Sequence, residues 1–92
     1  MGQNSDKFNN DSSQNSLLDR ITVDSNILTG KPIIRGMRIS VEQILRALSL
    51  GMSYQEILKE FPVLEEEDIQ AVLLYAYESI AIEKIYPIKK AG

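Results

Sequence analysis

The sequence contains neither cysteine nor histidine. Disulfides are therefore excluded, and so are metal sites built from thiolate or imidazole ligands. The chain also has no apolar run long enough to cross a membrane, and no apolar stretch near its first residue that would serve as a signal peptide. We therefore expect a cytoplasmic protein that makes no contact with a membrane.

The absence of histidine and cysteine also removes residue types that enzymes commonly use for catalysis. Without histidine or cysteine the chain lacks the commonest bases and nucleophiles, and no serine stands in a nucleophile-elbow pattern. Glu65 and Asp68 are three residues apart and could offer oxygen ligands to Mg²⁺, but the pair lacks a third convergent ligand. We expect a protein that is not an enzyme, with no catalytic residue, cofactor or metal.

The 92 residues allow one domain at most. Residues 1–16 are mostly Asn, Ser, Gln and Asp, with Phe8 as their only large aromatic residue, so we expect this segment to be disordered. Residues 17–86 would form the domain, and residues 87–92 a short basic tail. A domain of about 70 residues has a small core, and self-association often compensates for that, so we expect a homodimer.

Short apolar segments separated by turn residues precede the helical part. Residues 21–23 alternate apolar and polar side chains, which predicts a short strand. Residues 33–34 and 37–39 predict two more short strands around a tight bend at Arg35 and Gly36. Gly36 would supply the positive φ that such a bend requires.

Three helices follow, each marked by its first residues. Ser40 with Gln43, and Ser53 with Glu56, form capping boxes that start the first two helices. Gly51 is expected to end the first helix in a left-handed conformation. The third and longest helix would begin at four acids, residues 65–68, which suit the positive end of the helix dipole. The residues to which we assign a purely structural role are Ile44, Leu48, Ile57, Leu73 and Ala76.

The third helix is apolar on more than one face. Its expected core stripe consists of Ile69, Val72, Leu73, Ala76 and Ile80. Further apolar side chains lie off that stripe, and in so small a protein they suggest a surface for a partner, most simply a second copy. The candidates for this partner face are Leu74, Tyr75, Ile82 and Ile85.

The order of elements fits a mainly α fold, a tri-helical helix-turn-helix preceded by short β-strands. The run IIRGMRISV at residues 33–41, followed by LGMS at 50–53 and EIL at 56–58, resembles the bacterial family called domain of unknown function 433. The resemblance extends over residues 21–78, with departures at Met37 and Glu65, where Thr and a capping Thr or Ser are usual.

What this resemblance implies is a homeodomain-like, winged-helix-related fold. It also implies an antitoxin-like role, in which the protein binds a toxin with a PIN-type fold and regulates transcription of their shared promoter.

Charge is unevenly distributed and bears directly on DNA binding. Residues 17–50 carry five positive and three negative side chains, whereas residues 51–86 carry two positive and eight negative. In a helix-turn-helix the last helix normally enters the major groove by its N-terminal end, and here that end is acidic, so phosphates would be repelled. Any contact with double-stranded DNA is therefore expected from the basic residues of the first half: Lys31, Arg35, Arg38 and Arg46.

Two interpretations of these basic residues stay open at this point. Arg35 and Arg38 would either contact DNA or be structural, pairing with carboxylates beside the bend. Correspondingly, the chain would be an antitoxin-like regulator that binds a partner and DNA, or a dimeric interaction module that has a helix-turn-helix shape without DNA binding.

Overall fold

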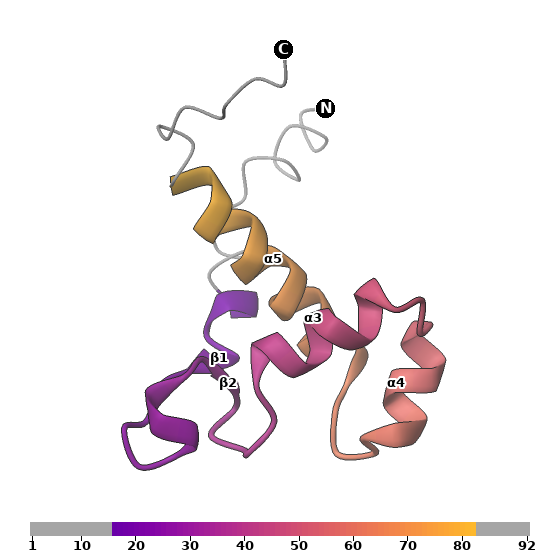
Figure 1. Ribbon diagram of the computed structural model, residues 1–92, viewed down its shortest axis with the longest axis horizontal. Helices are drawn as coiled ribbons and strands as arrows, with labels where there is room; N and C mark the ends of the chain where they lie inside the picture. The colour runs from indigo at the N-terminus through magenta and orange to yellow at the C-terminus, as the bar shows by residue number, and fades with distance from the viewer. Residues whose placement is uncertain (1–15, 83–92) are drawn as a thin grey trace, which may run out of the picture.

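The computed structural model describes residues 16–82. In chain order the elements are β1 (Ile21–Thr22), a short 3-10 helix η1 (Leu28–Gly30), β2 (Ile33–Ile34), α3 (Val41–Ser49), α4 (Tyr54–Glu60) and α5 (Glu66–Ile82). The expected mainly helical fold with short N-terminal strands is confirmed (Figure 1). The N-terminal segment expected to be disordered lies outside the described residues, apart from Ser16, and so does the basic tail.

The two strands pair with each other in an antiparallel sheet. Ile21 lies opposite Ile34, and Thr22 lies opposite Ile33. The third expected strand, at residues 37–39, is wrong: only an isolated bridge between Ile33 and Ser40 remains there. Residues 37–39 instead connect the bend to the α3 cap at Ser40, and the Ile34 N–H donates to the Ile39 carbonyl at 3.0 Å without a regular strand forming.

The bend itself has the expected conformation. Gly36 has a φ of 70° and Arg35 a φ of 45°. The Met37 N–H donates to the Ile34 carbonyl at 2.8 Å, which closes the turn. Positive φ at both central residues is the hairpin-type turn, so Gly36 serves the purpose predicted from the sequence.

Both capping boxes are confirmed. The Ser40 hydroxyl accepts from the Gln43 N–H at 3.0 Å, and the Ser53 hydroxyl accepts from the Glu56 N–H at 3.1 Å. In each box the side chain three residues on accepts from the N–H of the serine. Gly51, with a φ of 94°, follows the end of α3. These local signals therefore set the bounds of α3 and α4.

The core forms where α3, α4 and α5 meet, and α3 packs against both of the other helices. In Figure 1, β1 and β2 lie on one side of α3, and α4 lies on the other. Ile44 and Ile57 are fully buried, as predicted, and Leu48 packs against the core from a half-buried position. Full burial of such side chains contributes about 1.5–3 kcal/mol each. The buried core residues are Ile34, Val41, Ile44, Ile57, Leu64, Ile69 and Val72.

The predicted core stripe of α5 needs correction. Ile69 and Val72 are buried, but Leu73 is 41% exposed and Ile80 is 69% exposed, and Ala76 is only half-buried. The side chains that share the inner face with Ile69 and Val72 are those of Asp68 and Ala71. Since α5 is apolar on two faces, spacing alone could not choose between them.

Within residues 16–82, no helix combines the length and the apolar character required to cross a membrane.

Candidate functional site

A buried carboxylate lies at the start of α5. The side chain of Asp68 is fully shielded from solvent, and four hydrogen bonds reach its two oxygens. Arg35 donates from Nε to Oδ1 at 3.0 Å and from Nη2 to Oδ2 at 2.8 Å. Arg20 Nη1 donates to Oδ1 at 2.9 Å, and the Glu65 N–H donates to Oδ2 at 2.7 Å. A buried charge is tolerated only when it is paired in this way.

These contacts decide the ionisation of Asp68. Burial alone would raise the pKa of this carboxyl group, because it disfavours the charged form. The hydrogen bonds from Arg35, from the Glu65 N–H and from Arg20 act in the opposite direction and are stronger in sum, so the pKa of Asp68 lies below its usual value. Asp68 is therefore a carboxylate near neutral pH, held in place by two guanidinium groups.

The Asp68 cluster joins three parts of the chain. Arg20 precedes β1, Arg35 follows β2, and Asp68 lies in the first turn of α5. Arg35 Nη2 also donates to the Val63 carbonyl at 3.0 Å, in the connection between α4 and α5. The cluster thus fixes the small sheet against the start of α5, which is a structural role. Sequence reasoning missed Arg20 and the burial of Asp68, since no local pattern links residues so far apart.

The four candidate DNA-binding residues do not form one cluster. Arg35 is engaged with Asp68, as the structural interpretation expected. Lys31 forms an exposed ion pair with Glu42 at 2.9 Å. Within the described part of the chain, the side chains of Arg38 and Arg46 are exposed and form no ion pair. Two of the four basic side chains are therefore already paired within the protein.

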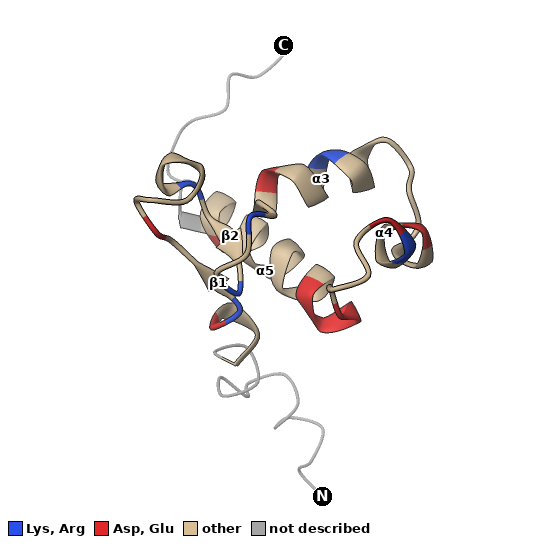
Figure 2. Cartoon of the chain, turned by 90° about the horizontal axis from the view of Figure 1, so that it is seen from below, with Lys and Arg blue, Asp and Glu red and all other residues tan. Residues whose placement is uncertain are grey.

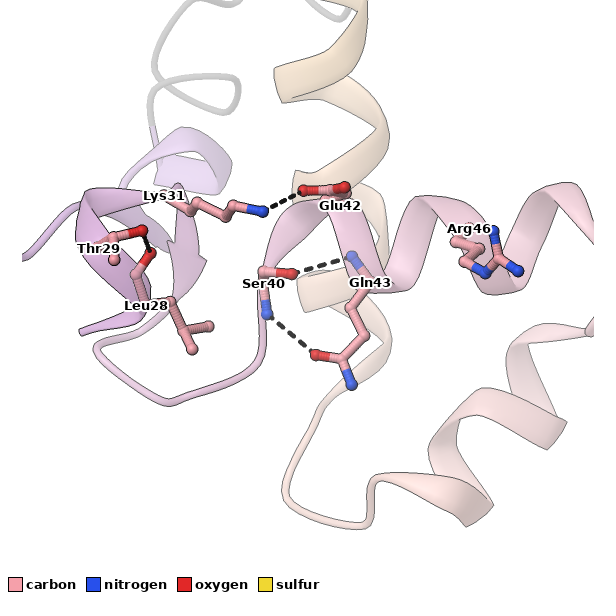
Figure 3. Close-up of a pocket in the computed structure, with 7 residues that line it drawn as sticks. All are labelled: Leu28, Thr29, Lys31, Ser40, Glu42, Gln43 and Arg46. Atoms are coloured by element: carbon pink, nitrogen blue, oxygen red, sulfur yellow. Dashed lines mark hydrogen bonds and ion pairs between the residues drawn. The ribbon is translucent and has the colours of Figure 1, made fainter.

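Lys31 and Arg46 do line a common groove beside the N-terminus of α3. The groove is open, with a volume of about 530 Å³. The capping pair Ser40 and Gln43 lines it, and the Lys31 side chain extends toward Glu42 on α3 (Figure 3). Because the helix N-terminus is already capped and Lys31 already paired, the groove offers Arg46 as its one unpaired basic side chain among the described residues.

Acidic residues are concentrated at the start of α5. Figure 2 shows the concentration of acidic residues there. Glu65, Glu66 and Glu67 are exposed, and only Asp68 is withdrawn into the interior. Glu65 Oε1 is paired with Arg20 Nη1 at 2.8 Å. In a helix-turn-helix this helix end would approach DNA, and the exposed carboxylates of Glu66 and Glu67 would repel the phosphates.

A row of exposed apolar side chains runs along α5. Leu73, Tyr77 and Ile80 are 41%, 64% and 69% exposed. They are four and three residues apart, so they lie on one face of the helix. We call these three residues the α5 stripe.

The partner face predicted from the sequence lies elsewhere on α5. Leu74 is half-buried, and Tyr75 is half-buried and packs against the core. The side chain of Ile82, and all of Ile85, lie outside the described residues. An apolar surface on α5 was expected, but the residues that the structure exposes most there are those of the α5 stripe.

An apolar groove of about 350 Å³ adjoins the α5 stripe between α3 and α5. Ile80 belongs to both the groove and the stripe, and the Lys31–Glu42 ion pair lies at the groove. The groove is lined by Lys31, Pro32, Val41, Glu42, Leu45, Tyr75, Ala76, Ser79 and Ile80. In residues 16–82, no group of three Asp or Glu side chains is arranged to hold a metal ion.

Sequence comparison with known proteins identifies a family model and a relative that match this chain. The family model described as "Protein of unknown function (DUF433)" matches residues 21–76, more than half of the chain. An uncharacterized protein of Sinorhizobium fredii, y4eO, is 32% identical over 56 residues, which cover 61% of this chain and 25% of that relative. This chain thus matches about a quarter of the length of its curated relative, and no solved structure matches it. The chain belongs to the DUF433 family.

Proposed function

We propose that this chain is an antitoxin-like protein-binding module that contacts its partner through the α5 stripe. The observation that carries the proposal is the exposure of Leu73, Tyr77 and Ile80 on one face of a single helix. Isolated apolar residues are common on protein surfaces, but a continuous apolar row on a small domain is typical of an interaction site. Full burial of an exposed apolar side chain gains about 1.5–3 kcal/mol, and these three gain less, Leu73 least of all, because each is already partly shielded in the free chain.

The stripe is separate from the residues that stabilise the fold. The inner face of α5 consists of Asp68, Ile69, Ala71 and Val72, all buried, whereas Tyr77 and Ile80 are largely exposed and Leu73 partly so. The core therefore does not require apolar side chains at residues 73, 77 and 80. Polar residues would serve as well there unless another surface covers them.

The class of partner that we propose, a toxin with a PIN-type fold, is what the resemblance described in the sequence analysis implies. An antitoxin of this kind needs an apolar surface for the toxin, and the α5 stripe supplies one. Regulation of transcription would then depend on DNA contacts made elsewhere than at the acidic start of α5.

A second candidate function, contact with double-stranded DNA, rests on a different observation. Arg38 and Arg46 are exposed, and within residues 16–82 neither forms an ion pair. With Lys31 they would be the contacts, whereas Arg35 is held by Asp68. So few phosphate contacts give weak, salt-sensitive affinity.

Fluorescence anisotropy with the chain's own upstream DNA tests this second function. We expect binding at low salt that is lost near physiological salt, and loss of the low-salt binding in the variant Arg38→Glu/Arg46→Glu. Sequence-specific binding that survives physiological salt and persists in that variant would contradict it.

The protein-binding function is tested by photo-crosslinking in the native cell. A photoreactive phenylalanine analogue replaces Tyr77, which keeps an aromatic side chain at the stripe. The matched control carries it at Gln55, an exposed position on α4. We expect position 77, and not position 55, to give a discrete crosslinked protein, identified by mass spectrometry. Equal crosslinking from both positions, or none to protein from position 77, would contradict the proposal.

A further inference from the structure

We infer that a groove along the exposed side of α3 binds an extended segment of a partner protein, in which one carboxylate side chain stands beside apolar side chains. This groove is a different surface from the α5 stripe, because the residues that line it all precede α5. The inference therefore goes beyond the proposed function, and either can fail without the other.

Two adjoining grooves form this surface. The first is the groove of about 530 Å³ beside the N-terminus of α3. The second, of about 300 Å³, lies between the C-terminal end of α3 and the end of α4. Gln43 and Arg46 line both, so the two grooves meet at these side chains. We call the two together the α3 groove; its middle is at Gln43 and Arg46.

The middle of the α3 groove offers hydrogen-bond donors. Arg46 is exposed and forms no ion pair within the described residues, and Figure 3 shows its guanidinium group apart from the Lys31–Glu42 pair. The side-chain oxygen of Gln43 accepts from the Ser40 N–H at 3.4 Å, which leaves the Gln43 amide nitrogen as a donor. A guanidinium group and an amide nitrogen only donate, and an ionised carboxylate only accepts. The middle of the groove is therefore complementary to a carboxylate.

Both ends of the α3 groove are apolar. Leu28 lines the end beside the N-terminus of α3. At the other end Leu50 is 70% exposed, whereas Met52 and Phe61 are half-buried and pack against the core. An exposed leucine beside two half-buried apolar side chains loses contact with water when an apolar side chain of a partner covers it, and this burial favours binding. The groove thus fits apolar side chains on either side of the carboxylate.

The spacing along α3 fits a peptide in an extended conformation. From Arg46 to Leu50 the helix advances by about 6 Å, because each residue adds about 1.5 Å. In an extended peptide, side chains two residues apart point to the same side and are separated by about 6.6 Å. A carboxylate at Arg46 therefore places the side chain two residues away in the peptide against Leu50.

The acidic residues of the α3 groove favour a single carboxylate over a row of phosphates. Glu60 lines the end of the groove beside Leu50, and within the described residues it forms no ion pair. It would repel a second negative charge there. At the other end Glu42 is paired with Lys31 at 2.9 Å, so that lysine is already neutralised. The DNA backbone carries a charge at every phosphate and would meet Glu60 as well as Arg46.

A titration of the isotope-labelled full chain with a short peptide, followed by amide NMR spectra, tests the inference. The probe is a five-residue peptide with blocked ends, with leucine at both ends, aspartate in the centre and serine between them. We expect the backbone amides of Gln43, Arg46 and Leu50 to shift, with a dissociation constant on the order of 1 mM. The same peptide with asparagine in the centre should bind about fivefold more weakly, because hydrogen bonds to a charged acceptor are stronger. Absence of shifts at these amides would overturn the inference.

Substitution of Arg46 tests which side chain recognises the carboxylate. Arg46→Gln should abolish the preference for the aspartate peptide over the asparagine peptide, and the same spectra show whether the variant is folded. Lys59→Gln is the matched control, because Lys59 is an exposed basic residue on α4 that lines neither part of the α3 groove, and it should keep the preference. A preference that persists unchanged in Arg46→Gln would overturn the inference.

Two further titrations separate the α3 groove from the other proposals. The double variant Leu73→Ser/Tyr77→Ser alters only the α5 stripe, so it should bind the aspartate peptide as tightly as the wild-type chain does. Loss of peptide binding in this variant, with the chain folded, would place the peptide on the stripe and overturn the inference. If double-stranded DNA shifts the amides of Gln43 and Arg46 and the aspartate peptide does not, the groove binds phosphates, and the inference is again overturned.

Discussion

Arg35 donates hydrogen bonds to both carboxylate oxygens of Asp68, 33 residues later in the chain, at 2.8 and 3.0 Å. This bidentate pair connects the turn after β2 with the first turn of α5 and buries Asp68 completely. Because Asp68 must face inward, α5 can bury only one of its two apolar faces. The other face, with Leu73, Tyr77 and Ile80, is left to solvent or to a partner.

Replacing the buried carboxylate tests the structural role of this pair. Asp68→Asn should lower the free energy of unfolding by about 2–3 kcal/mol, because Arg20 and Arg35 lose their charged acceptor. Both arginines retain some contact with water, so the loss should be smaller than for a fully buried pair. Urea unfolding followed by circular dichroism measures it. Glu67→Gln, at an exposed position of the same turn, is the control; an equal loss there would refute the assignment.

The bidentate geometry makes a separate prediction. Arg35→Lys should reduce the free energy of unfolding by about 1–2 kcal/mol, because an ammonium group cannot replace both guanidinium contacts in the same geometry. Arg38→Lys should change it by less than about 0.5 kcal/mol, since Arg38 is exposed and forms no ion pair within the described residues. Thermal unfolding of the two variants side by side measures the difference. Similar losses in both would show that the pairing of Arg35 contributes nothing specific.

The pH dependence of stability follows from the lowered pKa of Asp68. In the unfolded chain this carboxyl group titrates near its ordinary value of 3.8, and in the folded chain it titrates below that value. The unfolded state therefore binds the proton first as pH falls. The stabilisation is complete above the unfolded value and is lost as pH falls below it toward the folded value.

We accordingly expect the stability gap between the wild-type chain and Asp68→Asn to be constant near neutral pH and to narrow below about pH 4. Urea midpoints measured for both proteins across this range give the result. A gap that stays constant down to the acid limit of folding would mean that Asp68 is not a stabilised carboxylate.

The capping boxes predict a small and specific effect. Ser53→Ala should lower the free energy of unfolding by about 1 kcal/mol, because the Glu56 N–H loses its acceptor, whereas Ser53→Gly should cost less. Ser49→Ala is the matched control, since Ser49 only donates to the Arg46 carbonyl at the end of α3. Its effect should stay within about 0.5 kcal/mol in the same urea unfolding experiment. Equal losses at Ser49 and Ser53 would argue against the cap.

The features predicted correctly from the sequence are those decided within a few residues. The capping serines, the turn at Gly36 and the end of α3 at Gly51 each depend on neighbours in the chain. The placement of Ile44 and Ile57 in the core was also predictable, because α3 and α4 have one apolar face each.

The orientation of α5 could not be predicted in this way. Its two apolar faces are similar in composition, and the choice between them depends on Arg20 and Arg35 reaching Asp68 from far away in the chain. The partner of Arg35 could not be predicted either, because Asp68 lies 33 residues later in the chain. From the sequence alone, Arg35 is therefore a candidate for contact with DNA. The exposed apolar surface of α5 is therefore the α5 stripe, whereas Leu74 and Tyr75 are half-buried.

The contact role of the α5 stripe is tested most directly by the molar mass of the chain when it is isolated gently from its own cells. Light scattering after gel filtration would compare the wild-type chain with the double variant Leu73→Ser/Tyr77→Ser. We expect the wild-type chain in a protein assembly heavier than the 10.4 kDa monomer, and the double variant as a folded monomer. Equal masses for the two proteins, with both folded, would contradict a role of the stripe in binding.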